Sequence, residues 1–132
     1  MARPPSENLT EREAQIMEIL WREGSASAER IRQELPDDPH DSTVRTLLRI
    51  IENKGYAKHV VRGKAFVYRP AVRKASAERK AVMNVIKRFF GGSAQALVLR
   101  LIEDEQVTPD QLEQLRKTGT STRRPANEGG DA

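Results

Sequence analysis

The residues best suited to chemistry are the hydroxyl and guanidinium side chains that begin at Ser42. Guanidinium groups can pair with guanine edges or phosphates, and short hydroxyl groups can contact either. The amides of the first helical turn, at Ser42 and Thr43, would also suit a phosphate. The predicted DNA contacts of this segment are Ser42, Thr43, Arg45, Thr46 and Arg49. The alternative is that Ser42 only caps a helix and that the arginines are solvated.

A second group of cations surrounds Gly63. Arg62 and Lys64 flank this glycine, and Lys58 precedes them along the chain. Cations at the tip of a hairpin can neutralise phosphates. The predicted contacts are therefore Lys58, Arg62 and Lys64, although a turn that only increases solubility would have a similar composition. His59 is interpreted as a surface residue of a strand.

The charge distribution supports a polyanion as partner. Residues 1–41 carry 5 basic and 10 acidic side chains, whereas residues 42–74 carry 9 basic side chains and a single acidic one, Glu52. A concentrated basic block between acidic neighbours is typical of a surface that binds nucleic acid. The sequence therefore predicts double-stranded DNA as the main partner.

Several other classes of protein are poorly supported by the composition. The chain has no Cys, and its two His residues, His40 and His59, are far apart in the sequence. No Gly-rich phosphate loop stands in the required context. We therefore predict no catalytic residues, no metal site, no cofactor and no enzymatic activity. The apolar stretches are too short to span a bilayer and no targeting segment is recognised, which predicts a cytoplasmic protein.

The elements that must position these residues follow from capping signals and apolar spacing. Thr10 and Glu13 form a capping box for a first helix, and Ser27 caps a short second one. A third helix begins near Asp41 or Ser42. Its apolar stripe is Val44, Leu47, Leu48 and Ile51. Strands at Tyr56–Arg62 and Ala65–Arg69 complete a winged helix-turn-helix, in which Trp21, Phe66 and Tyr68 are expected in the core.

The C-terminal part is predicted to be helical and to need a partner. Helices are expected over 71–90 and 94–105, with a shorter one that opens at the capping box of Thr108 and Gln111. This region is too small for a core of its own. Its apolar residues would form a homodimer interface: Val82, Val85, Ile86, Phe89, Phe90, Leu97, Val98, Leu101, Ile102, Leu112 and Leu115. The alternative is that these helices fold back on the N-terminal domain.

The predicted fold class is mostly α with a small β-hairpin wing. An N-terminal winged helix-turn-helix precedes a C-terminal helical dimerisation region. The predicted domains are a disordered leader over 1–8, a DNA-binding domain over 9–70, a dimerisation domain over 71–117 and a disordered tail over 118–132.

Several segments together are similar to one family. They are Leu9–Glu13, Met17–Trp21, Ser42–Leu48, Lys54-Gly55, Phe66–Tyr68, Phe89–Ser93 and Leu97-Val98. In this order they resemble the penicillinase repressor family, the BlaI/MecI/CopY-type winged-helix repressors, over about residues 9–116. The resemblance implies a homodimeric repressor that binds a palindromic operator and blocks transcription, with Ser42, Thr43, Arg45 and Thr46 on its recognition helix.

The resemblance also implies a means of ending repression. In the β-lactam branch a membrane sensor-protease triggers cleavage of the repressor within its dimerisation region. The matching position here is the Arg100–Leu101 bond, where the family has an Asn–Phe bond. The metal site of the copper-responsive branch needs Cys residues, which this chain lacks. A different class of function stays open, namely a protein-interaction module that uses the winged helix without DNA.

Overall fold

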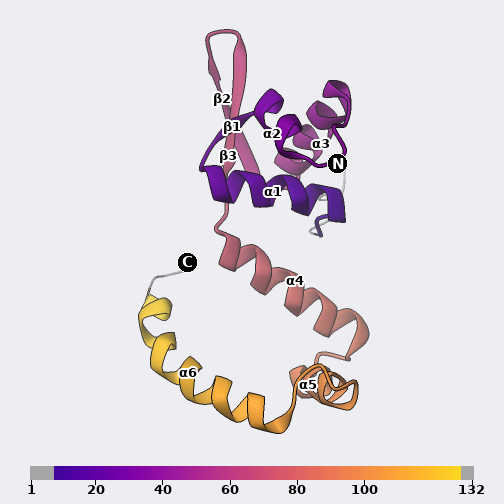
Figure 1. The fold of residues 1–132 in the computed structure, drawn as a ribbon, viewed down its shortest axis with the longest axis vertical. Helices are drawn as coiled ribbons and strands as arrows, with labels where there is room; N and C mark the ends of the chain where they lie inside the picture. The colour runs from indigo at the N-terminus through magenta and orange to yellow at the C-terminus, as the bar shows by residue number, and fades with distance from the viewer. Residues whose placement is uncertain (1–7, 129–132) are drawn as a thin grey trace. The chain divides into compact units, whose positions relative to one another are not determined.

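A computed structural model describes residues 8–128 of the chain, with side chains described for residues 8–119. The chain divides into two compact units, residues 1–74 and 75–132, and each is considered by itself. The order of elements in the first unit is that of a winged helix (Figure 1). They are α1 (Glu11–Glu23), β1 (Ala26–Ser27), α2 (Ala28–Glu34), α3 (Asp41–Asn53), β2 (Ala57–Arg62) and β3 (Ala65–Pro70).

Side-chain caps fix where the first two helices begin. The Thr10 hydroxyl accepts from the Glu13 amide at 3.1 Å, and the Glu13 carboxylate accepts from the Thr10 amide at 2.9 Å. This confirms the predicted capping box. Ser27 accepts from the Arg30 amide at 3.1 Å and so caps α2, as predicted. The N-cap of α3 is His40, without a side-chain bond, so Ser42 lies inside the helix rather than capping it.

The core of the first unit lies between the three helices. Its fully buried side chains are Ile16, Met17, Leu20, Ile31, Val44, Leu48 and Ile51. Burying each such side chain contributes about 1.5–3 kcal/mol to folding. The predicted stripe of α3 is therefore confirmed at three of its positions, and the fourth, Leu47, is half-buried. This packing fixes which face of α3 is left for solvent.

The sheet has three antiparallel strands in the order β1-β3-β2. The two-residue strand β1, which the sequence analysis did not predict, pairs Ala26 with Tyr68. The β2–β3 ladder runs from Ala57 opposite Pro70 to Arg62 opposite Ala65. Gly63 in the connecting turn has a φ of +63°, which glycine adopts without steric cost. In Figure 1 the hairpin projects beyond the helices of this unit.

Of the three aromatic residues predicted in the core, Phe66 is the exception. Tyr68 is buried, and Trp21 is partly buried and donates from Nε1 to the Val72 carbonyl at 3.0 Å. Phe66, however, is 43% exposed. It pairs with Val61 near the turn of the hairpin, and its ring stacks on His59 instead of packing among the helices, so the prediction that it is a core residue was wrong.

A buried ion pair joins the start of α1 to the end of α3. The Lys54 Nζ lies 2.7 Å from Glu13 Oε1 and donates to the Asn8 carbonyl at 2.7 Å. The two charged side chains are 10% and 4% exposed. Asn8 is thus held in place, although the prediction placed it in a disordered leader; residues 1–7 lie outside the described residues. Lys54 belongs to the basic block of residues 42–74, but its charge pairs with Glu13 within the fold.

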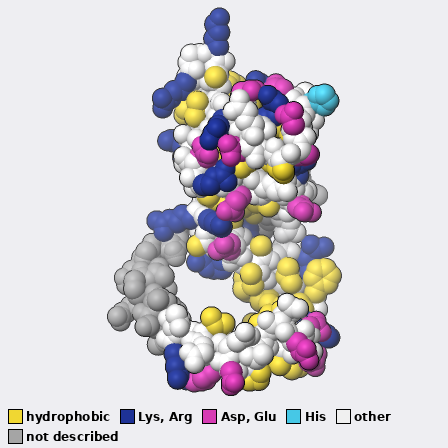
Figure 2. Space-filling view, viewed as in Figure 1, with side chains coloured by type: hydrophobic (Ala, Val, Ile, Leu, Met, Phe, Trp, Pro, Cys, Tyr) yellow, Lys and Arg dark blue, Asp and Glu magenta, His cyan; other side chains and the backbone are white. Residues whose placement is uncertain are grey.

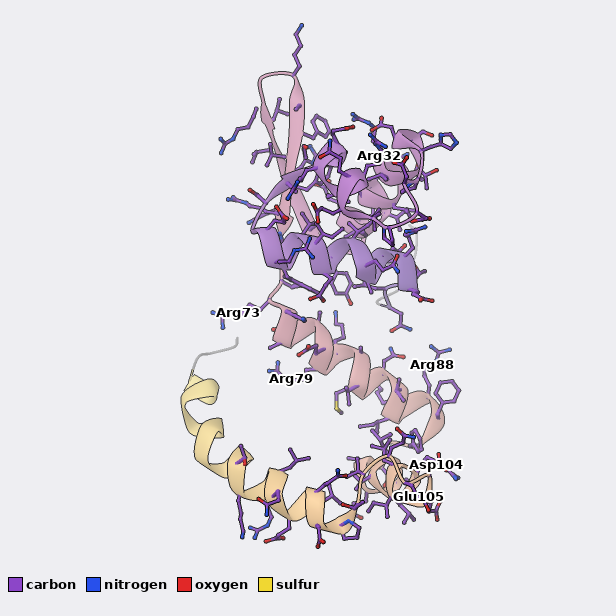
Figure 3. The ribbon with its side chains drawn as sticks, viewed as in Figure 1. Arg32, Arg73, Arg79, Arg88, Asp104 and Glu105 are labelled. Atoms are coloured by element: carbon purple, nitrogen blue, oxygen red, sulfur yellow. The ribbon has the colours of Figure 1, made fainter. Side chains whose placement is uncertain are left out.

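The second unit is formed by α4 (Lys74–Phe89), α5 (Ala94–Glu103) and α6 (Pro109–Glu128). Asp104 and Glu105, labelled in Figure 3, form the turn after α5, where Glu105 has a φ of +60°. The second predicted capping box is confirmed. The Thr108 amide donates to Gln111 Oε1 at 2.9 Å, and the Gln111 amide to the Thr108 hydroxyl at 3.1 Å.

Helix α6 continues past residue 117, where the sequence analysis placed the start of a disordered tail. The backbone is helical to residue 128, and residues 129–132 lie outside the described part. Once the capping box has nucleated the helix, each further residue adds one backbone hydrogen bond at a lower cost than nucleation. Among the described residues, no helix is long and apolar enough to cross a membrane.

Candidate nucleic-acid interface

Helix α3 presents its polar face to solvent because its apolar stripe is packed against α1 and α2. All five residues predicted to contact DNA from this helix are exposed: Ser42, Thr43, Arg45, Thr46 and Arg49. Four of them, at positions 42, 45, 46 and 49, follow the spacing that places side chains on one face of a helix. The Thr43 amide donates to the His40 carbonyl at 3.1 Å. The prediction that this amide is free to bind a phosphate was therefore wrong.

Arg45 is held by a neighbour on the same helix. Its Nε lies 2.6 Å from the Asp41 Oδ2, one turn earlier. The hydrogen bond to Asp41 raises the pKa of Arg45 above its ordinary value, so the guanidinium group is charged. The two side chains are 59% and 50% exposed, which leaves them in contact with solvent. Arg45 is thus a cation with a defined local partner.

Two adjoining hollows separate α3 from the hairpin, and Arg45 lines both. The first, which we call the His59 hollow, has a volume of about 280 Å³. It is lined by Arg45, Arg49, Glu52, His59, Phe66 and Tyr68. The second, the Lys64 hollow, has a volume of about 250 Å³ and is lined by Ser27, Ala28, Glu29, Arg45, Lys64, Ala65 and Phe66. The fold therefore brings the cations of α3 and Lys64 around one surface.

His59 connects the hairpin to α3. Its Nδ1 lies 2.8 and 2.9 Å from the two carboxylate oxygens of Glu52. Because a carboxylate only accepts hydrogen bonds, Nδ1 carries the proton. The ring stacks on Phe66 with centroids 4.1 Å apart, and Tyr68 lies 5.4 Å away. His59 was predicted to be a surface strand residue; it is partly buried and fixes how the hairpin sits against α3.

The strands of the hairpin carry their cations on the face away from α3, and Lys64 in the turn lines the hollow beside Arg45. The strand register places His59 opposite Tyr68 on the face towards α3. Lys58 and Arg62 lie on the other face because side chains alternate along a strand. Arg69 lies opposite Lys58 and adds a third cation there. Figure 2 shows dark blue side chains at the free end and along the side of the hairpin, whereas dark blue and magenta side chains lie together over the helices.

The cations of this unit fall into two groups according to their partners. Those of α1 and α2 are ion-paired: Arg12 with Asp37, Arg22 with Glu34, Arg30 with Glu23, and Arg32 with Glu29 and Asp38. Arg32 is labelled among the helices in Figure 3. Five others make no hydrogen bond or ion pair with any described residue: Arg49, Lys58, Arg62, Lys64 and Arg69. Among the described residues of this unit, the cations without such a partner thus lie on α3 and the hairpin.

Three groups in this surface were not predicted from the sequence. The Asp41–Arg45 pair could have been found from its spacing of four residues, which places both side chains on one helix face. The Glu52–His59 contact joins two elements and has no local signal. Arg69 becomes a candidate only once the strand register is known, because the register places it beside Lys58.

In the second unit the predicted dimerisation residues are largely uncovered. Among residues 75–119, whose side chains are described, Ile86 is the one buried residue. Exposed apolar side chains include Val82, Val85, Phe89, Val98 and Leu115. The other predicted contacts are half-buried: Phe90, Leu97, Leu101, Ile102 and Leu112. Val107 and Leu115 line an apolar hollow of about 310 Å³.

The Arg100–Leu101 bond lies inside α5 rather than in a loop. Arg100 is exposed and pairs with Glu103 at 3.2 Å, and Leu101 is half-buried. At the end of α4, the Arg88 guanidinium, labelled in Figure 3, lies 5.4 Å from the centre of the Phe89 ring.

Comparison with known proteins identifies relatives of this chain. The penicillinase repressor family model matches residues 9–120. The methicillin resistance regulatory protein MecI of Staphylococcus aureus (strain N315) is 31% identical over 106 residues, which cover 79% of this chain and 86% of that protein. The penicillinase repressor of Bacillus licheniformis is 24% identical over 109 residues, or 81% of this chain and 85% of that protein. The solution structure of the DNA-binding domain of the repressor BlaI is 25% identical, covers 57% of this chain and 92% of that chain, and has a TM-score of 0.47.

Proposed function

This chain belongs to the penicillinase repressor family, and from that premise we propose that it is a homodimeric transcriptional repressor that binds a palindromic DNA operator. In each protomer α3 enters the major groove, and the basic hairpin meets the phosphate backbone beside it. The contacts from α3 are Ser42, Thr43, Arg45, Thr46 and Arg49, and those from the hairpin are Lys58, Arg62 and Lys64, to which we add Arg69.

The observation that carries this proposal is the division of the cations. Paired arginines on α1 and α2 have their charge satisfied within the fold. The unpaired ones on α3 and the hairpin have no such partner among the described residues, and a phosphate backbone supplies one. Because Lys58, Arg62 and Arg69 lie on one face and Lys64 lines the hollow beside α3, the hairpin can meet phosphates on either side. A surface used only for contacts with another protein would not need this arrangement.

The exposed apolar residues of the second unit support dimerisation. With Ile86 alone buried among residues 75–119, one copy covers little of its apolar surface. A symmetric dimer would cover it with the same surface of a second chain. Two copies of α3 then read two half-sites related by a two-fold axis, which explains a palindromic operator.

The test of DNA binding is a titration of the full-length protein on duplexes recovered from a random pool. We expect enrichment of a palindrome and an affinity that falls steeply as salt rises. Random duplex of the same length serves as the control. Equal affinity for both, or no dependence on salt, would overturn the proposal and would favour a protein-interaction module.

The dimer is tested with Phe89→Asp, which places a charge at a side chain that is 70% exposed in one chain. The single chain tolerates this change because Phe89 packs against little. We expect the mass in analytical ultracentrifugation to fall from that of two chains to that of one. Gln95→Asp, also at an exposed position, is the control and stays dimeric. A Phe89→Asp variant that keeps the mass of the parent would contradict this interface.

Repression would end by cleavage of the Arg100–Leu101 bond in α5, by a membrane sensor-protease or a protease that it activates. A protease binds an extended backbone, so α5 must open locally first. Mass spectrometry of the repressor recovered from induced and uninduced cells tests this. A new C-terminus at Arg100 supports the proposal, whereas an intact chain during full induction rejects it.

A further inference from the structure

We propose that Asp41 is a positioning residue that orients Arg45 to read a guanine in the operator. This inference rests on the proposed function, because it assumes that α3 lies in the major groove. It assigns different tasks to the two arginines of α3. Arg45 reads a base, and Arg49 contacts a phosphate.

The contact between Asp41 and Arg45 leaves the two terminal nitrogens of the guanidinium group available to contact a base. Arg45 uses its Nε to donate to Asp41 Oδ2 at 2.6 Å. The structure gives its two terminal nitrogens no partner within the described chain. Those two groups form the fork that donates to guanine O6 and N7 together. A guanidinium held through Nε loses less rotational freedom on binding a base, so the contact becomes more selective.

Among the described residues, Arg49 has no hydrogen bond of the kind that orients Arg45. It lies one turn after Arg45 on the exposed face of α3, and it has no hydrogen bond or ion pair to a described residue. It lines the His59 hollow, beside the hairpin. An unheld cation is free to follow a phosphate, which does not require a fixed orientation. The contrast between the two arginines is the first support for separate tasks.

The charge of Asp41 supplies the second support. Its carboxylate lies in the first turn of α3, where the helix dipole would otherwise attract a phosphate. One amide of that turn, of Thr43, is already bonded to the His40 carbonyl. A negative group at this point repels the DNA backbone and therefore lowers general affinity. The carboxylate stabilises α3 through the helix dipole, and its contact with Arg45 gives it a second role on the DNA-facing side of the helix.

The effect on folding is small enough to keep the test clean. Both side chains of the pair are at least half exposed, and exposed pairs contribute little to stability. Asp41→Asn removes the charge and keeps the size. Asp38→Asn is the matched control, because it removes the same charge from the loop before α3, where Asp38 pairs with Arg32 instead.

The experiment selects operators from a random duplex pool with the parent protein, Asp41→Asn, Arg45→Ala and the double variant. We expect the parent to require a G·C pair at one position of each half-site. Asp41→Asn lowers that preference by about fivefold or more, since a bidentate contact of this kind carries most of the discrimination at its base pair. It also raises affinity for random duplex by about twofold, because one repulsive charge is lost. Asp38→Asn leaves the base preference unchanged.

The outcomes separate this inference from the proposed function. If the parent selects no sequence at all, the proposed function fails. If Arg45→Ala loses the G·C preference while Asp41→Asn keeps it, the function stands and the role of Asp41 is rejected. If Asp41→Asn still changes the preference when Arg45 is already Ala, Asp41 acts by another route and the inference is also rejected. Support requires that the double variant match Arg45→Ala.

Discussion

Lys64→Ala should weaken binding to every DNA sequence by a similar factor and reduce its dependence on salt. Lys64 lies at the tip of the hairpin, lines a hollow together with Arg45, and has no partner among the described residues. Its charge is therefore available for a phosphate. Replacing it changes no hydrogen bond of the fold, so the effect on binding is not confused with an effect on stability.

The size of the effect follows from the number of unpaired cations. Of the 9 basic side chains in residues 42–74, Arg45, Lys54, Arg73 and Lys74 have partners, which leaves 5 per chain. If all contact phosphates in a dimer, the slope of log affinity against log salt is about −9, and losing Lys64 from both chains reduces it to about −7. Each phosphate contact adds about fivefold in affinity between 1 M salt and about 0.15 M salt. Losing two contacts therefore lowers the affinity at about 0.15 M salt by about 30-fold.

The assay is a fluorescence anisotropy titration on the selected palindrome and on random duplex at several salt concentrations. Arg22→Ala is the matched control, because it removes the same charge from α1, where Arg22 pairs with Glu34 at 3.0 Å. We expect its slope to equal that of the parent. The reasoning is refuted if Lys64→Ala keeps the parental slope, or if Arg22→Ala reduces it as much.

Two further predictions concern stability. Lys54→Met leaves the buried Glu13 carboxylate with the Thr10 amide as its remaining hydrogen-bond donor. We therefore expect the free energy of unfolding, measured with urea, to fall by about 2–3 kcal/mol. A fall of less than about 1 kcal/mol would show that solvent reaches this pair. The hydrogen bond from Arg12 lowers the pKa of Asp37 below its ordinary value of 3.8. The stability that this pair adds is therefore present above that pH, and it is lost as the pH falls through the lower pKa of Asp37 in the folded state. The free energy of unfolding should therefore fall less with decreasing pH for Arg12→Gln than for the parent, and an unchanged pH dependence would contradict this assignment.

Local signals explain why much of the first unit could be predicted. A capping box needs two residues three positions apart, and the core face of α3 needs a stripe of apolar residues; both are visible in a single segment. The hairpin was found for the same reason, since Gly63 stands between two runs of strand-forming residues. Each of these features depends on neighbours in the sequence.

Features that depend on distant residues could not be predicted. Strand β1 exists because Ala26 meets Tyr68 across the sheet, and two residues carry no strand signal. The exposure of Phe66 depends on how far the hairpin projects, which its alternating pattern does not reveal. The Glu52–His59 contact likewise requires that α3 and β2 be placed together. The charge pattern located the basic surface but did not show which cations were already paired.

The separation of paired from unpaired cations has an evolutionary consequence. A substitution at Arg12 or Arg30 disturbs an ion pair of the fold, so change there is held back by the need to stay folded. Arg49 and Lys64 have no such duty, and after a gene duplication they can diverge at little structural cost. Sister copies of this chain would then differ in their general affinity for DNA while inheriting the same scaffold, whereas a new operator would require a change at the base-reading position, Arg45.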